Sequence, residues 1–275
     1  MTPEIIEYSQ VRLEIEGGLA TVILADPARL NALTGDMVIG VITALQEVAK
    51  PRRNIRCLMI TGDGRGFCAG ANLMRGGGGG GPPEEGAPKN LAALGAVETL
   101  FHPLIRRLRD VQVPVVAAVN GPCVGFGVAM ALTADYIVAS EDAYFLVPFR
   151  NLASCLDSGL SWMLPRTVGP MRARQMILRA IRVDAPTALS WGLIAETAAP
   201  AEFRQAARRI ADEFASGPTV ALGVMRRLII DSEQRSLDEQ LEAEARGVAI
   251  TSRTKDNVAA LRVFGTKTTP EFTGA

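Results

Sequence analysis

The segment Ile55-Arg-Cys-Leu-Met-Ile-Thr-Gly-Asp-Gly-Arg-Gly-Phe-Cys-Ala-Gly-Ala-Asn-Leu73 decides the fold, because in it an apolar run leads directly into a glycine-rich loop. The same order recurs in Val113-Pro-Val-Val-Ala-Ala-Val119, which is followed by Asn120-Gly-Pro-Cys-Val-Gly-Phe-Gly127. A short apolar run of this kind is typical of a strand buried on both faces of a parallel sheet. Glycine clusters mark the turn that follows such a strand. The sequence therefore predicts an α/β fold built from repeated strand, loop and helix units.

The flanking sequence extends this pattern in both directions. Residues 11–15 and 20–24 alternate or run apolar around a glycine pair, which predicts a β-hairpin. Thr34 is the predicted N-cap of an amphipathic helix that follows it. From Ser158 onward nearly every segment has helical periodicity, and the composition becomes all-α near residue 200. We therefore expect residues 1–200 to form the catalytic core and residues 201–275 a C-terminal helical cap and oligomerisation region.

Composition excludes several classes of function. The 275 residues include 29 basic and 29 acidic side chains, so the net charge is zero, and His102 is the only histidine. One histidine cannot build a multi-histidine zinc site, so we expect no metal, and the lack of a basic excess argues against nucleic acid as a partner. No apolar run reaches the roughly 18 residues of a membrane span. Four cysteines without CxxC spacing indicate a reduced, cytoplasmic protein.

The two glycine-rich loops raise the question of what they bind. Gly62 and Gly64 begin a dinucleotide-binding pattern, but Phe67 occupies the position of its third glycine, and the chain has no P-loop motif. Two loops that each follow a buried strand can instead direct one backbone N–H each toward a common point. Two converging N–H groups stabilise an oxyanion. The loops therefore predict an oxyanion hole, with two purely structural turns as the alternative.

Five motifs together resemble a known family. They are, in chain order, Pro27-Ala-Arg-Leu-Asn-Ala-Leu-Thr34, Gly66-Phe-Cys-Ala-Gly-Ala-Asn-Leu73, Pro114-Val-Val-Ala-Ala-Val-Asn-Gly121 with Gly125-Phe-Gly127, Ala134-Asp-Tyr-Ile-Val-Ala-Ser140 and Leu164-Pro-Arg-Thr-Val-Gly169. In order and spacing they are similar to the crotonase (enoyl-CoA hydratase/isomerase) superfamily. The resemblance implies a crotonase-like spiral of ββα units, a C-terminal helical trimerisation and lid region, and a homotrimer or dimer of trimers. It also implies an acyl-CoA substrate, with coenzyme A entering as part of that substrate and no cofactor bound permanently.

The resemblance implies roles for individual residues as well. The oxyanion-hole N–H groups would belong to Ala71 and Phe126. The positions of the two glutamates that hydratases of this family use are occupied here by Ala129 and Phe149, so the pair of carboxylates that adds water is missing. Asp157 occupies a third carboxylate position, which carries the acid in isomerase branches of the family. One carboxylate is enough to move a proton between two carbons. The resemblance therefore favours a double-bond isomerase, either of the 3-enoyl-CoA to 2-enoyl-CoA type or a ring-type acyl-CoA isomerase.

Several alternatives stay open at this level. Asp157 is also well placed to be only the N-cap of the next helix. His102 falls where 4-chlorobenzoyl-CoA dehalogenases have an active-site histidine, and in a hydrolase of that kind Asp157 would be a nucleophile. An enoyl-CoA hydratase is a further enzymatic alternative. A catalytically silent CoA-binding protein is the alternative from a different class.

The resemblance also implies where coenzyme A would be held. Arg29, Ala69 and Asn72 belong to the two core loops that would contact it, with a solvated surface arginine as the alternative for Arg29. Phe264 and Lys267 lie at the end of the last predicted helix, where the same chain or a neighbouring subunit would close over the bound CoA.

The acyl group needs an apolar pocket. Phe145, Phe149 and Trp162 are the expected acyl-pocket residues, although an aromatic side chain in an apolar run is also typical of plain core. The glycine run at residues 76–81, followed by two prolines, predicts a mobile loop on which acyl selectivity would depend.

Overall fold

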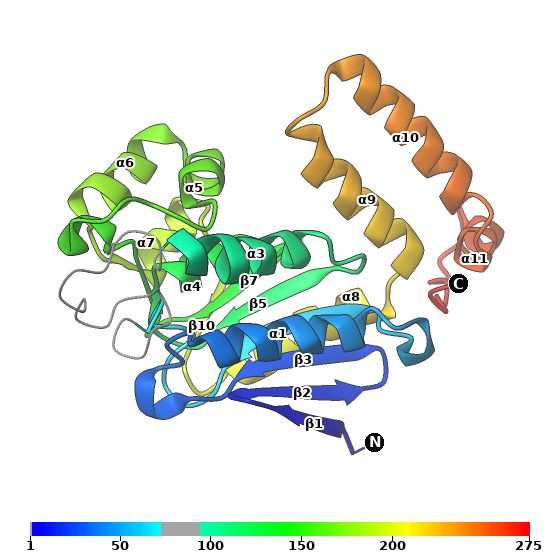
Figure 1. Cartoon of the computed structure of the whole chain (residues 1–275). Helices are drawn as coiled ribbons and strands as arrows, with labels where there is room; N and C mark the ends of the chain where they lie inside the picture. Colours follow the sequence, from blue (N-terminus) through cyan, green and yellow to red (C-terminus); the bar gives the residue numbers. More distant parts are fainter. Residues whose placement is uncertain (1, 73–93) are drawn as a thin grey trace.

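The centre of the structure is a seven-stranded mixed sheet (Figure 1). The computed structural model describes residues 2–72 and 94–275, so the predicted loop at residues 76–81 lies outside the described residues. Strands β1, β2 and β3 pair antiparallel, and the remaining strands of this sheet pair parallel. In the order in which they lie across the sheet, the strands are β1 (Glu4–Tyr8), β2 (Val11–Glu16), β3 (Leu19–Leu24), β4 (Cys57–Gly62), β5 (Val115–Val119), β7 (Tyr136–Ser140) and β10 (Glu196–Ala198).

The predicted hairpin is confirmed as β2 and β3, whose register runs from Val11 opposite Leu24 to Glu16 opposite Leu19. The two buried strands that were predicted before the glycine-rich loops are confirmed as β4 and β5. No expected element corresponds to β1. Its side chains are exposed or half-buried, and it is held as an edge strand by backbone pairing with β2. A strand without a buried face leaves little trace in a hydrophobic pattern.

Both faces of β4 and β5 are covered by helices, which explains why these two strands are almost wholly apolar. Leu58 and Ile60 of β4 point into the larger core cluster, which α1 (Gly35–Val48) and α3 (His102–Arg109) cover. Cys57 and Met59, which alternate with them along the strand, point to the opposite face, where α8 (Phe203–Ser216) packs. Successive side chains of a strand point to opposite faces, so a strand between two helical layers has few polar positions.

Helices lie around the sheet, and one set of them extends away from it (Figure 1). Thr34 caps α1 as predicted, because its Oγ1 accepts a hydrogen bond from the Met37 N–H at 3.1 Å. The helices are α1 (Gly35–Val48), α3 (His102–Arg109), α4 (Phe126–Ala131), α5 (Leu160–Val168), α6 (Pro170–Arg179), α7 (Ala185–Ser190), α8 (Phe203–Ser216), α9 (Thr219–Ser232), α10 (Leu237–Thr251) and α11 (Lys255–Val263). Short helical turns are η1 (Pro27–Arg29), η2 (Pro51–Arg53), η4 (Phe149–Leu152) and the π-helical turn η3 (Val97–Phe101).

Helix α8 belongs structurally with the sheet, although it lies inside the predicted C-terminal region of residues 201–275. Its side chains Phe203, Ala207 and Ile210 are buried against the face of the sheet that α1 leaves open. The helices that stand apart are α9, α10 and α11, which extend away from the sheet (Figure 1). Helix periodicity alone cannot tell a helix that covers a sheet from one that leaves it, so the division at residue 200 stays a prediction.

A second, three-stranded sheet lies beside the site described below. It consists of β6 (Cys123–Val124), β8 (Tyr144–Leu146) and β9 (Val183–Asp184). Its strand β6 is part of the second glycine-rich loop and pairs parallel with β8. The small sheet thus fixes that loop against the segment that leads to Asp157.

Candidate active site

A cavity of about 550 Å³ opens where the loops after β4 and β5 meet the segment that precedes α5. Its walls are mainly apolar, and among the described residues Asp157 is the only charged side chain in them. The described residues that line it are Ala69, Gly70, Ala71, Leu94, Val97, Phe101, Val124, Gly125, Phe126, Pro148, Phe149, Asn151, Leu152, Ser154, Cys155, Leu156 and Asp157. The two predicted oxyanion positions and the predicted carboxylate therefore share one cavity.

The two glycine-rich loops are joined to each other by backbone contacts. Cys68 and Cys123 form a parallel bridge, and the Val124 N–H donates to the Cys68 carbonyl at 2.9 Å. Gly70 and Gly125 follow with φ of 89° and 54°, a region that side chains disfavour. Each loop therefore turns sharply directly after the contact, at the point where Ala71 and Phe126 begin.

The N–H groups of Ala71 and Phe126 remain available at these turns. The neighbouring Asn72 N–H donates to the Leu33 carbonyl and the Gly125 N–H to the Leu146 carbonyl. Within the described part of the chain, no backbone hydrogen bond is recorded for the N–H of Ala71 or Phe126. Since both residues line the cavity, its wall contains two unused donors, and a pair of converging N–H groups is what stabilises an oxyanion.

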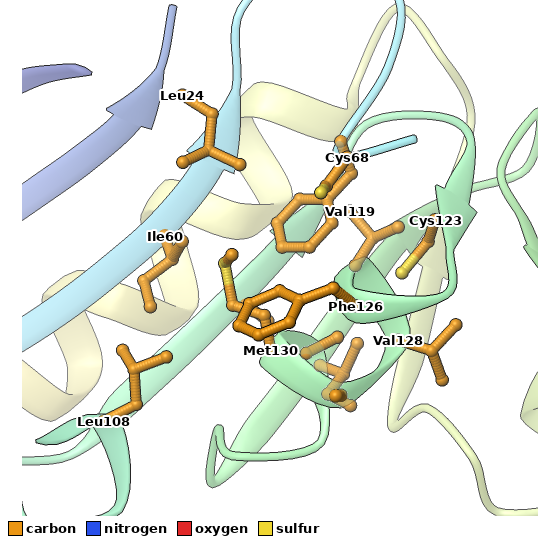
Figure 2. Close-up of a cluster of buried hydrophobic side chains, with 14 of the residues drawn as sticks. Leu24, Ile60, Cys68, Leu108, Val119, Cys123, Phe126, Val128 and Met130 are labelled. Carbon is orange, nitrogen blue, oxygen red and sulfur yellow. The ribbon is translucent and has the colours of Figure 1, made fainter. Parts of the chain in front are cut away.

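Phe126 contributes its backbone to the cavity and its ring to the core. Figure 2 shows the ring pointing into the cluster that contains Ile60, Leu108 and Met130. Its centroid lies 5.1 Å from that of Phe101, and the residue is 3% exposed. This packing anchors the N–H, because the peptide cannot rotate without moving a buried aromatic ring.

Asp157 supplies the carboxylate of the cavity. Partial burial raises the pKa of this carboxyl above its ordinary value, while a hydrogen bond from Ser158 and the nearby His102 act in the opposite direction. The Ser158 Oγ donates to Asp157 Oδ1 at 2.8 Å. The alternative role of Asp157 as a helix cap is wrong, because Gly159 is the N-cap of α5 and no side chain caps that helix.

His102 is the first residue of α3 and follows the π-helical turn η3. It acts on the charge of Asp157 from the facing helix, but it is not among the described residues that line the cavity. The structure therefore brings the two predicted titratable groups near each other and gives only Asp157 access to the cavity.

The predicted acyl-pocket residues do not all lie together. Phe149 lines the cavity, as expected. Phe145 is 1% exposed and packs in the core, because its place on β8 turns its side chain inward. Trp162 lies between two guanidinium groups, 4.7 Å from that of Arg109 and 4.2 Å from that of Arg166, and is not in the described lining. The expectation for Phe145 and Trp162 is thus corrected, and these rings serve packing.

The cavity wall includes residues that the sequence did not single out. Leu94, Val97 and Phe101 come from the segment before α3, and Leu156 comes from the segment before Asp157. The spacing of the first three, at i, i+3 and i+7, is a helical stripe, but such a stripe is more often core than cavity wall. Only the fold shows that this stripe faces the two loops.

The predicted CoA contacts are also separated. Ala69 lines the cavity, and Asn72 is buried beside it in the same loop. The Arg29 guanidinium lies 3.0 Å from the Asp26 carboxylate, with a side chain that is 45% exposed. Phe264 is 87% exposed at the end of α11. Neither Phe264 nor Lys267 is among the described residues that line the cavity, and α11, which precedes them, lies on the other side of the molecule from α4 and α5 (Figure 1).

Both glutamate positions of the hydratase pattern are blocked. Ala129 is fully buried in α4 and is not in the described lining of the cavity, and Phe149 presents a ring there. Within residues 2–72 and 94–275, no group of three or more metal-binding side chains is present. None of the helices in these ranges combines the length and apolar character that a membrane crossing needs.

Comparison with known proteins agrees with this fold. Residues 14–275 match the family described as enoyl-CoA hydratase/isomerase. The chain is 34% identical to the 1,2-epoxyphenylacetyl-CoA isomerase of Escherichia coli over 94% of its length and 97% of that protein. It is 32% identical to a protein of Rhodobacter capsulatus named probable enoyl-CoA hydratase, over 98% of this chain and all of the other.

A solved structure gives the same result. A crystal structure from Mycobacterium abscessus, assigned as an enoyl-CoA hydratase/isomerase, superposes with a TM-score of 0.87 at 32% identity, covering 96% of this chain and 100% of that one. The chain belongs to the enoyl-CoA hydratase/isomerase family and has the crotonase fold. It is an acyl-CoA enzyme of that family.

Proposed function

We propose that this enzyme is an acyl-CoA isomerase that moves a proton with a single carboxylate, Asp157. The observation that carries the proposal is that Asp157 shares one cavity with the unused N–H groups of Ala71 and Phe126, while Ala129 and Phe149 replace the two hydratase glutamates. An enzyme with one carboxylate and an oxyanion hole is equipped for proton transfer without water.

The steps follow from these groups. With the thioester carbonyl oxygen between the N–H groups of Ala71 and Phe126, a proton on C2 becomes acidic, and ionised Asp157 removes it. The electron pair of the C2–H bond forms the enolate, whose negative charge the two N–H groups stabilise. The carboxylic acid of Asp157 then gives the proton to C4, and the C3–C4 double bond becomes a C2–C3 double bond. Burial supports both steps, since a raised pKa makes the protonated carboxyl a longer-lived intermediate state.

The acyl group is expected to be apolar. The described lining consists mainly of aliphatic and aromatic side chains, and Phe101 and Phe149 suit either an unsaturated chain or a ring. The similarity to the Escherichia coli 1,2-epoxyphenylacetyl-CoA isomerase supports the ring-type substrate. A 3-enoyl-CoA and 1,2-epoxyphenylacetyl-CoA are therefore the two substrates to compare.

Isotope exchange tests the proposal. A 3-enoyl-CoA incubated in D₂O with the wild-type enzyme should give the 2-enoyl-CoA product, and Asp157→Asn should lower turnover by about 10²-fold or more while acyl-CoA binding, measured by calorimetry, is retained. Turnover that survives in Asp157→Asn would refute the assignment. Hydration of crotonyl-CoA at a rate above isomerisation would favour the hydratase alternative. Binding of CoA thioesters without turnover of either substrate would indicate a silent CoA-binding protein.

A second candidate rests on the proximity of His102 to Asp157. In a 4-chlorobenzoyl-CoA-dehalogenase-like hydrolase, Asp157 would attack the ring carbon and expel chloride, and His102 would activate the water that cleaves the resulting ester. The electrostatic effect of His102 on Asp157 supports this arrangement. Chloride release from 4-chlorobenzoyl-CoA that is lost in His102→Gln would favour it over isomerisation.

We also propose that a homotrimer or dimer of trimers completes the CoA site. Phe264 and Lys267 are expected to close over the CoA of a neighbouring subunit, which the 87% exposure of Phe264 and the absence of both residues from the described lining of the cavity support. Arg29 and Asn72 would then contact CoA from the core. Sedimentation of the wild type and of Phe264→Asp would test the assembly, which should dissociate in the variant.

We further infer a cytoplasmic location, which the four free cysteine thiols support.

A further inference from the structure

Ser158 lies directly beside Asp157 and is completely buried. Its backbone has a φ of 54°, in the left-handed region that residues other than glycine rarely occupy. Such a conformation costs free energy and persists only where the surrounding structure imposes it. The turn that carries Ser158 is therefore held in place by its environment, with the side chain enclosed.

The hydroxyl of Ser158 has one recorded partner. Its Oγ donates to Asp157 Oδ1 at 2.8 Å, and no other hydrogen bond is recorded for it among the described residues. It does not cap α5, and it is absent from the described lining of the cavity. The hydroxyl therefore contacts the carboxylate from a residue that is outside the described wall of the cavity.

We propose that Ser158 is a positioning residue, whose hydroxyl holds Oδ1 of Asp157 and leaves Oδ2 as the oxygen that takes the proton from C2 and returns it to C4. This inference rests on the proposed isomerase function. Oδ2 accepts no recorded hydrogen bond within the described part of the chain, so it is the oxygen free to receive a proton. An anchored carboxylate keeps one oxygen over both carbons, which are close neighbours in the substrate.

The same hydrogen bond affects the pKa of Asp157 and so the pH at which the base is ionised. Burial opposes the charge of Asp157, and the Ser158 hydroxyl and His102 favour it. Cys155 is the other titratable side chain in the described lining. Removal of the hydroxyl therefore leaves His102 as the one group that favours the carboxylate, and the pKa of Asp157 rises.

The pH dependence of kcat/KM for 3-enoyl-CoA isomerisation separates positioning from simple damage. In Ser158→Ala the acidic limb of this pH profile should shift to higher pH by about half a pH unit to one pH unit. At pH values below the shifted limb kcat/KM should fall roughly threefold to tenfold relative to the wild type, and at higher pH it should recover. General damage to the fold would lower activity by one factor at every pH. Ser158→Gly provides a second variant that lacks the hydroxyl, and because glycine accepts positive φ it keeps the turn.

A matched control removes a hydroxyl from the neighbouring helix. Thr167 Oγ1 donates to the Met163 carbonyl within α5, so Thr167→Ala should leave the limb in place. A limb that stays at the wild-type pH in folded Ser158→Ala or Ser158→Gly would overturn the inference. Asp157→Asn keeps the two claims separate. If that variant is inactive and the Ser158 limb is unmoved, only the role of Ser158 fails, whereas an active Asp157→Asn refutes the isomerase proposal itself.

Discussion

The backbones of Gly70 and Gly125 lie close together, since a Cβ built on either glycine would lie 3.9 Å from the Cα of the other. These residues come from loops that follow different strands of the main sheet, β4 and β5. Each precedes one of the two unused N–H groups, those of Ala71 and Phe126. The distance between the two donors is therefore set by a contact between glycines, and the site tolerates little change at either position.

Gly70→Ala should damage the oxyanion hole. A Cβ at Gly70 would lie 3.1 Å from the Val124 carbonyl oxygen, and the φ of 89° is unfavourable for alanine. We expect kcat for isomerisation to fall by about 10²-fold, the usual effect of losing one oxyanion donor. Gly35→Ala is the control, because its Cβ would make only an ordinary contact of 3.7 Å with Leu100. A Gly70→Ala enzyme with kcat near the wild-type value would contradict this account.

Asp157→Asn should be more stable than the wild type at neutral pH. Burial raises the pKa of Asp157 above its unfolded value, so the ionised carboxylate destabilises the fold above that pKa, and the penalty disappears as the pH falls through it. We expect a rise in Tm of about 2 °C at neutral pH that vanishes near about pH 4. Thermal unfolding at both pH values measures it. If Asp157→Asn raised Tm by the same amount at both pH values, the charge of Asp157 would be excluded as the cause.

Arg226→Met should destabilise the chain strongly. The buried Arg226 guanidinium lies 2.7 Å from the Asp135 carboxylate and connects α9 to the core. It also donates to four backbone carbonyls, those of Leu108, Arg109, Val111 and Thr133. Removing it leaves these acceptors and a partly buried carboxylate without their partner, at a cost of about 3–5 kcal/mol in the free energy of unfolding.

Urea unfolding measures this loss, with Arg204→Met as the control. Arg204 is an exposed residue of α8, so its replacement should change stability by less than about 0.5 kcal/mol. A loss below about 1 kcal/mol for Arg226→Met would mean that water replaces the guanidinium at these carbonyls.

Phe149→Ala should weaken substrate binding more than catalysis. The Phe149 ring forms part of the apolar wall, so its removal should raise KM for an apolar acyl-CoA by roughly fivefold to tenfold. Trp162→Ala should instead lower Tm and leave KM unchanged, because that ring packs between Arg109 and Arg166 away from the described lining. A KM effect of equal size in both variants would show that Trp162 also contacts the acyl group.

Hydrophobic pattern and glycine placement were enough to predict the hairpin, the buried strands β4 and β5 and the capped helix α1. These are local features, in which the residues that form an element are adjacent in the chain. Strand β1 and the position of α8 were not predictable in this way. Strand β1 depends on pairing with β2, and α8 depends on an open face of a sheet that forms from distant segments.

The same distinction between local sequence and tertiary structure applies to the candidate active site. By itself the sequence determined the two glycine loops, the family resemblance and the replacement of the hydratase glutamates by Ala129 and Phe149. Only the tertiary structure decided that Asp157 shares a cavity with Ala71 and Phe126 and that the Ser158 hydroxyl donates to Asp157 Oδ1. It also decided that Phe145 and Trp162 lie outside the described lining of this cavity. The physical reason is that a residue type limits the chemistry a position can perform, whereas the direction of its side chain is set by packing against residues far away in the chain.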